Sequence, residues 1–355
     1  MSSTDMPPLT APDLQKLSAW LDAAVAACPG SGHAAKYAAW SEGVLAGLAA
    51  GASDGQFCQA LSAASRYAPK GALAPSPQLV ADAEDLLAGW NPSRWTALEA
   101  ARVRLIVERA KADPESLLSA LEEAFRYADE GELCALYRSL QFLPGPERFA
   151  VRSAEGCRTN MKTVFEANGM DTPFPEAHFD DVAWHQLCMK SLFVEAPLWR
   201  VVGFDRRVDE ELARMALDLA DERRSAGRRV FPELWMCMGS AESGLEATKR
   251  KLAAIEKELS GDDELSRKGA ILALGRLGQT ERLEEIQADG GTYFGPIAGW
   301  ALMGRHDQTA FASISPPEGA EPQTREHEEG RAQGALLFPG DTDSDPATDT
   351  PGNPS

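Results

Sequence analysis

The chain has 355 residues, of which 44% are hydrophobic and 25% charged, as in ordinary globular proteins. Its net charge is −19, whereas proteins that bind nucleic acids normally present a basic stripe to the phosphates, so we predict no nucleic-acid partner. No stretch approaches the roughly 18 to 20 apolar residues that span a membrane, and no transmembrane segment is predicted. Residues 1–15 lack the basic and apolar regions of a secretory signal, which predicts a cytoplasmic protein.

Apolar residues at three- and four-residue spacing predict helices along the first part of the chain. The expected helices begin near residue 10 or 12 and then cover about 34–50, 53–67, 77–89, 92–111, 114–128 and 130–143. Three of them follow a capping residue and a proline, at Ser76-Pro77, Asn91-Pro92 and Asp113-Pro114. The capping oxygen accepts a free backbone N–H, and proline has no N–H to leave unpaired.

The middle and later parts of the chain are also expected to be helical. Helices are predicted at about 146–168, 181–194 and 208–226, with an extended turn at 171–180. Residues 266–278 resemble the second helix of a HEAT-like repeat, and 293–303 would be its partner. These short helices with short breaks predict an all-α fold of stacked helical hairpins, a HEAT-like α-solenoid over residues 11–313. Residues 1–10 and the acidic, proline-rich residues 314–355 are predicted to be disordered.

Cysteines and histidines give little sign of a metal site. The six cysteines form no C-x-x-C pair, and we expect free, buried thiols. His178, Asp180, Asp181 and His185 invite a metal interpretation, but their spacing matches no ligand motif. A capping aspartate and two partly exposed histidines are favoured instead. No metal and no cofactor are predicted.

Residues 151–239 contain most of the unusual polar placements. The helix expected at 181–194 is apolar on most sides, and Gln186 and Lys190 share one narrow polar strip. Lys190 therefore either reaches solvent or a carboxylate, or lines a pocket together with Gln186. The arginines at 223–229 either complement a helix dipole or form a patch for an anion or an anionic partner. The candidate contact residues of the whole stretch are Arg158, Asn160, Glu166, Gln186, Lys190, Asp205, Arg206, Arg223, Arg224, Arg228 and Arg229.

This stretch resembles the EboA family, helical proteins that are encoded in bacterial gene clusters for metabolite export. The resemblance is carried by segments that include Arg158-Thr-Asn160, Val164-Phe-Glu166, Pro173-Phe-Pro175, Lys190-Ser-Leu-Phe193, Asp205-Arg206, Ala226-Gly-Arg228 and Pro232-Glu-Leu-Trp235. Residues 92–150 are compatible with it, whereas the first 90 and the last 60 contribute nothing. His185 departs from the asparagine that the family has after the tryptophan, so it is not expected to be a functional residue of the family.

The resemblance implies a cytoplasmic accessory role in moving a secondary-metabolite precursor toward the periplasm. It transfers no catalytic residue. It implies as partners a TatD-type hydrolase, a UbiA-type membrane prenyltransferase and sugar-isomerase-like proteins, together with a small hydrophobic metabolite. Membrane association would then come through a partner.

Three functional hypotheses follow. The preferred one is a non-enzymatic helical scaffold or carrier, because the sequence has no nucleophile elbow, P-loop, dinucleotide fingerprint or metal motif. The second is a small-metabolite enzyme with Lys190 and either Glu166 or His185 in a pocket, where a buried lysine acts as base or nucleophile. The third, a helical-repeat nucleic-acid binder, is disfavoured by the charge.

Overall fold

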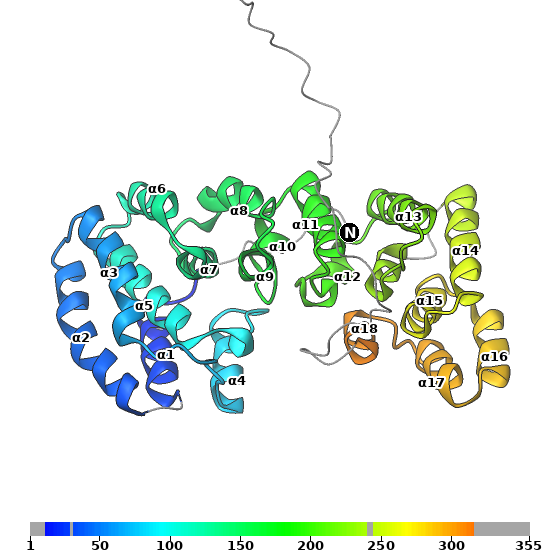
Figure 1. The fold of residues 1–355 in the computed structure, drawn as a ribbon, viewed down its shortest axis with the longest axis horizontal. Helices are drawn as coiled ribbons and strands as arrows, with labels where there is room; N and C mark the ends of the chain where they lie inside the picture. Colours follow the sequence, from blue (N-terminus) through cyan, green and yellow to red (C-terminus); the bar gives the residue numbers. More distant parts are fainter. Residues whose placement is uncertain (1–10, 29–30, 240–243, 316–355) are drawn as a thin grey trace, which may run out of the picture. The chain divides into compact units, whose positions relative to one another are not determined.

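The computed structural model describes residues 11–28, 31–239 and 244–315, and the structural statements below concern these residues. Their regular secondary structure is helical, and the β-type pairing among them is one isolated antiparallel bridge between Ala72 and Thr96 (Figure 1). The predicted all-α fold is therefore confirmed. A regular HEAT-like repeat stays a prediction. Residues 1–10 and 316–355, which carry nearly all of the predicted disorder, lie outside the described residues.

The first helices are arranged around α5. The helices of this part are α1 (Leu14–Ala27), α2 (Ser31–Ala49), α3 (Asp54–Tyr67), α4 (Pro77–Leu86), α5 (Ala97–Ala112), α6 (Leu117–Tyr127) and α7 (Glu130–Ser139). Helix α5 contacts α1, α2, α3 and α7, which bury most of its side chains. Three of these are arginines, and each reaches a carboxylate: Arg102 faces Glu132, Arg104 faces Asp22, and Arg109 faces Asp54. A buried charge is tolerated only when it is paired in this way.

The three helices predicted to begin with a capping residue and a proline differ in where they begin in the structure. Ser76 caps α4 as predicted, with Pro77 in the first turn. Asn91-Pro92 opens only the 3-10 turn η1 (Pro92–Arg94), because Trp95 is extended and packs against Trp90 and Phe142. Helix α5 begins after Thr96, which forms a capping box with Glu99. Likewise, Asp113 accepts the backbone N–H of Ser116, so α6 begins at Leu117 and not at Pro114.

The middle of the chain is more broken than predicted. Its elements are η2 (Leu140–Phe142), η3 (Pro146–Phe149), α8 (Ala150–Gly156), α9 (Lys162–Gly169), α10 (Phe174–His178), α11 (Asp181–Phe193), η4 (Leu198–Arg200), α12 (Phe204–Arg207), α13 (Glu210–Ser225) and η5 (Pro232–Met238). The single helix predicted at 146–168 is wrong, because α8 ends at Gly156 and α9 folds back on it through the Ser153–Asn168 hydrogen bond of 2.7 Å. The turn predicted at 171–180 contains α10.

A glycine permits the close approach at the end of α8. A Cβ atom on Gly156 would lie 2.6 Å from the ring of Tyr137, so only glycine fits where α8 passes α7. The next residues turn, and Thr159 Oγ1 accepts the backbone N–H of Met161 at 3.1 Å just before α9 begins. The predictions for α11 and α13 agree with the structure to within two residues, and Asp209 caps α13.

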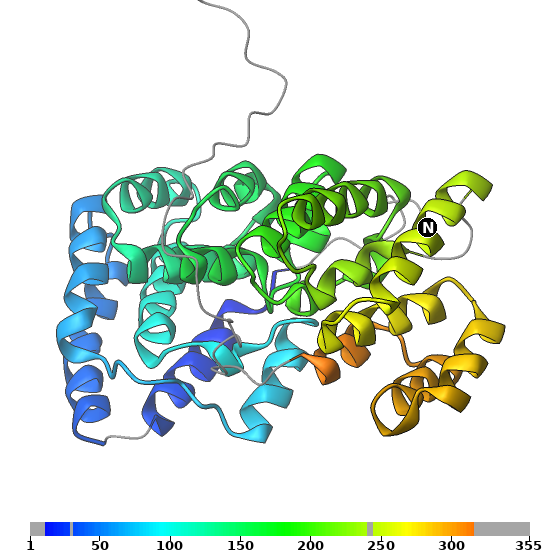
Figure 2. The ribbon, with the colours of Figure 1, turned by 45° about the vertical axis from the view of Figure 1, so that its right-hand side comes forward.

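Helix α15 organises the last helices of the described chain. These are α14 (Leu245–Leu259), α15 (Glu264–Arg276), α16 (Thr280–Asp289), α17 (Gly291–Leu302) and α18 (Gln308–Ile314), and the yellow and orange helices α14 to α17 lie together in Figure 2. Helix α15 packs against η5, α14, α17 and α18. A Cβ atom on Gly269 would lie 2.6 Å from the carbonyl oxygen of Pro232, so the small face of α15 is pressed against η5. Beside it, Trp235 Nε1 donates to Ser266 Oγ at 3.1 Å. No helix in the described ranges has the length and apolar character needed to cross a membrane.

Candidate functional site

The candidate residues do not line one common pocket. Glu166 accepts a hydrogen bond from Arg200 Nη1 at 2.6 Å, and Asp171 accepts another from Arg200 Nη2 at 2.6 Å. The side chains of Arg200 and Asp171 are 3% and 6% exposed, so this network is part of the interior. Burial acts to lower the pKa of Arg200, but Asp171 and Glu166 outweigh it and the pKa is raised. Glu166 is thus engaged in holding α9 to η4.

Three further candidates also join helices. Arg206 donates to both oxygens of Glu176, at 2.6 and 2.7 Å, and thereby ties α12 to α10. Asp205 accepts from Arg276 at 2.5 Å and from the backbone of Gln308 at 2.8 Å, which connects α12 with α15 and α18. Arg224 donates to Glu258 at 2.7 Å, between α13 and α14. These side chains stabilise the packing of distant segments.

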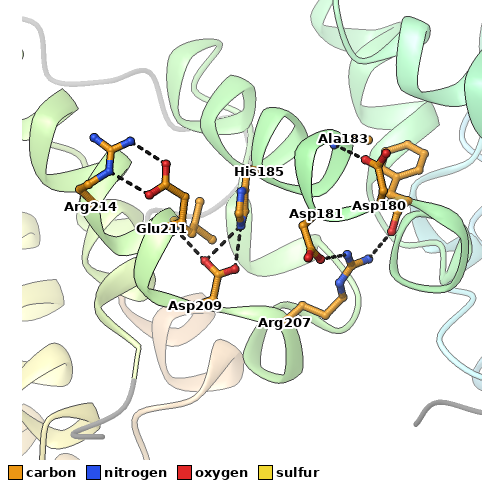
Figure 3. A network of polar contacts seen from close by, with 10 residues as sticks. Asp180, Asp181, Ala183, His185, Arg207, Asp209, Glu211 and Arg214 are labelled. Carbon is orange, nitrogen blue, oxygen red and sulfur yellow. Dashed lines mark hydrogen bonds and ion pairs between the residues drawn. The ribbon is translucent and has the colours of Figure 1, made fainter. Parts of the chain in front are cut away.

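His185 belongs to a chain of capping and ion-pair contacts (Figure 3). Its Nε2 lies 2.9 Å from Asp209, whose other role is to accept the backbone N–H of Leu212 at the start of α13. Asp180 caps α11 as predicted, by accepting the backbone N–H of Ala183. Within the described part of the chain, no three His, Cys, Asp or Glu side chains come close enough together to hold a metal ion. His185, Glu166 and Lys190 each contact a different partner.

Two of the remaining candidates, Lys190 and Asn160, are in contact. Lys190 Nζ donates to Asn160 Oδ1 at 2.8 Å, and Lys162 Nζ donates to the carbonyl oxygen of Glu195 at 2.7 Å. The connection between α8 and α9 therefore lies against the last turn of α11 (Figure 1). Gln186, one turn before Lys190 on α11, is half-buried.

The arginines at the end of α13 adjoin this face through Glu195. Helix α13 packs against α11. Burial lowers the pKa of Arg223, and the negative charge of Glu195 opposes that shift. The pKa of Arg223 is also lowered by its neighbours Arg228 and Arg229. We call this face the basic surface and define it by its six cations and two apolar side chains: Arg158, Lys162, Lys190, Arg223, Arg228, Arg229, Met161 and Phe193.

Two apolar side chains of the basic surface are exposed. Met161 and Phe193 are 42% and 50% exposed, although Phe193 belongs to the helix predicted to be apolar on most sides. Met161 directly precedes α9, and Phe193 is the last residue of α11. The Lys190 ammonium lies 5.2 Å from the centroid of the Phe193 ring, and burial lowers the pKa of Lys190. Arg158 and Arg228 are exposed, and no ion pair between described residues includes either one.

The family is decided by sequence comparison. A family model described as "Metabolite traffic protein EboA" matches residues 16–239. The chain belongs to the EboA family. The family description associates it with metabolite traffic, and the whole basic surface lies inside the matched range. The match begins at residue 16, so the expectation that the first 90 residues contribute nothing was wrong. No curated protein and no solved structure matches this EboA chain.

Proposed function

We propose that this EboA protein is a non-enzymatic scaffold or carrier in metabolite traffic, and that it holds a partner protein at the basic surface. The composition of that surface supports the proposal. On a chain of charge −19, the surface combines six cations with an exposed phenylalanine and an exposed methionine, although Arg229 is paired with Asp263 and the charge of Glu195 acts on Arg223. Arginine, methionine and aromatic residues are the types enriched where proteins bind one another. The other charged candidates are engaged in joining helices and are poor contact residues.

The proposed partners are those that the family resemblance implies: the TatD-type hydrolase, the UbiA-type prenyltransferase and the sugar-isomerase-like proteins. A cytoplasmic location and a small hydrophobic cargo are parts of the same proposal. The enzymatic alternative has less support, because Lys190 donates to an amide oxygen, while Glu166 and His185 contact Arg200 and Asp209. A nucleophilic lysine is activated by a neighbouring base or by a lowered pKa; burial does lower the pKa of Lys190, but its contacts are an amide oxygen and a phenyl ring.

Native mass spectrometry of gently purified protein tests the proposal. Wild type is compared with Arg158→Glu/Arg228→Glu and with the control Lys70→Glu/Lys257→Glu. All four side chains are exposed, and both pairs change the net charge equally. We expect a cluster protein to accompany wild type and the control at fixed stoichiometry, and to be lost from Arg158→Glu/Arg228→Glu. Retention by all three proteins would reject the basic surface, and a small molecule released on denaturation without any partner protein would reject the scaffold role.

A further inference from the structure

The six cations of the basic surface come from three separate segments. Arg158 and Lys162 flank the start of α9, Lys190 lies on α11, and the three arginines follow or end α13. One of them, Arg223, is held in place by two contacts. Arg223 Nε donates to the carbonyl oxygen of Arg229 at 2.6 Å, and its guanidinium lies 4.0 Å from the centroid of the Phe231 ring. Cations that are fixed before binding lose less conformational entropy when a ligand arrives.

Resting on the proposed function, we infer that the basic surface recognises an acidic segment of its partner that carries one apolar side chain. Arg158 and Arg228 offer guanidinium groups, which match carboxylates with two parallel hydrogen bonds. The apolar side chain packs on Phe193 and Met161, the exposed apolar members of the surface. The cations supply the long-range attraction, and the apolar contact fixes the register of the segment.

An acidic peptide fits the electrostatics better than an anionic membrane does. Residues 1–315 carry a net charge of −12, so an extended negative plane would meet a molecule that is acidic overall. Charges are screened over about 8 Å at physiological salt, so a narrow segment at Arg158 and Arg228, which have no ion pair among the described residues, feels these cations more than the rest of the acidic molecule. Membrane-surface binding also relies on a broad apolar helix face, whereas the basic surface exposes two apolar side chains.

Fluorescence anisotropy with the full chain tests this inference. The probe is a short labelled peptide of aspartate and glutamate around a central Leu-Phe pair, and its control has serine at both central positions. We expect wild type and Lys70→Glu/Lys257→Glu to bind the Leu-Phe peptide equally, and Arg158→Glu/Arg228→Glu to bind it about tenfold more weakly. Binding should weaken steeply from about 50 to about 200 mM salt, because exposed charge pairs are screened. Phe193→Ala should remove the preference for the Leu-Phe peptide over the serine peptide.

Different failures lead to different conclusions. Equal peptide binding by all variants would overturn the inference. It would also be overturned if the peptide does not bind while phosphatidylserine vesicles or a DNA duplex are retained by wild type and released by Arg158→Glu/Arg228→Glu. If a partner protein depends on Arg158 and Arg228 for binding but no acidic peptide binds, this inference alone is rejected and the scaffold role is retained. Peptide binding that depends on these arginines, without any co-purifying partner, would reject the scaffold role alone.

Discussion

Replacing Gly203 with alanine should destabilise the fold by more than backbone strain alone. Gly203 precedes α12 with φ of +79°, a conformation that L-residues rarely adopt. A Cβ atom there would lie 1.9 Å from Cδ and 2.0 Å from Oε1 of Glu176, far inside van der Waals contact. The Glu176 carboxylate, 3% exposed, would have to leave its position against Arg206.

The expected loss has two parts. The left-handed backbone costs about 1–2 kcal/mol for a residue with a Cβ atom. Displacing Glu176 breaks its paired hydrogen bonds to Arg206, and because Arg206 is 63% exposed we assign only about 1 kcal/mol to that pair. The sum is about 2–3 kcal/mol. Gly227 provides the control, since its φ is +68° and a Cβ atom added there would meet open space, with no surrounding atom within 4 Å. Gly227→Ala should therefore show the backbone part alone, about 1–2 kcal/mol.

Urea denaturation followed by far-ultraviolet circular dichroism measures these free energies of unfolding. A double-mutant cycle with Glu176→Ala isolates the clash, because alanine at 176 vacates the space that the new methyl group needs. We expect Gly203→Ala to cost less in the Glu176→Ala background than in wild type. If Gly203→Ala costs no more than Gly227→Ala, or if the cycle is additive, the steric argument is refuted.

Four further substitutions test the interior and the titration of one acid. Trp235→Ala should lower the free energy of unfolding by about 3–5 kcal/mol, because the indole is fully buried. Ser266→Ala should lower it by about 1–3 kcal/mol, because the indole N–H loses its acceptor. Calorimetry that shows unchanged melting temperatures would contradict both predictions. Arg200→Met should cost about 3–5 kcal/mol by urea denaturation, because Asp171 would stay buried without its main partner, and a neutral result would show that solvent reaches this carboxylate. Burial raises the pKa of Glu233 above its ordinary value of 4.5. As far as this group is concerned, the folded protein is therefore most stable relative to the unfolded chain below pH 4.5, where Glu233 is protonated in both states. This stabilisation is lost as the pH rises through the raised pKa of the folded state. Glu233→Gln should therefore melt higher than wild type near neutral pH, with the difference shrinking on acidification, and parallel melting curves at all pH values would reject this assignment.

Local signals in the sequence predict much of the helical pattern. Ser76 and Pro77 both act within one turn, so the start of α4 can be read from adjacent residues. The break between α8 and α9 depends instead on Tyr137, which meets Gly156 from another helix. Periodicity continues across Gly156, and nothing near it in sequence indicates the contact. A prediction from spacing alone therefore joins the two helices.

The candidate site residues were predicted with unequal success for the same reason. Asn160 and Lys190 are in contact, and their selection rested on local polar placement. Arg224 was chosen as part of an arginine-rich stretch, yet its partner Glu258 lies 34 residues away and on a helix that was not predicted. Phe193 was passed over because aromatic residues in a helical stripe are usually interior. The exposed side of α11 could have been found only by knowing which of its faces the neighbouring helices cover.

The position at which the family match ends has a consequence for exchanging segments between relatives. The match stops at Gly239, directly after five residues of η5, Leu234 to Met238, that are completely buried, and α15 lies against that segment. The matched range thus ends at a buried segment that the later helices cover. In a relative with different later helices, other side chains of the same chain or of a second subunit must cover Trp235. Exchanging α14 to α18 between members of the family is consequently a problem of matching two surfaces, and the length of the joining loop is secondary.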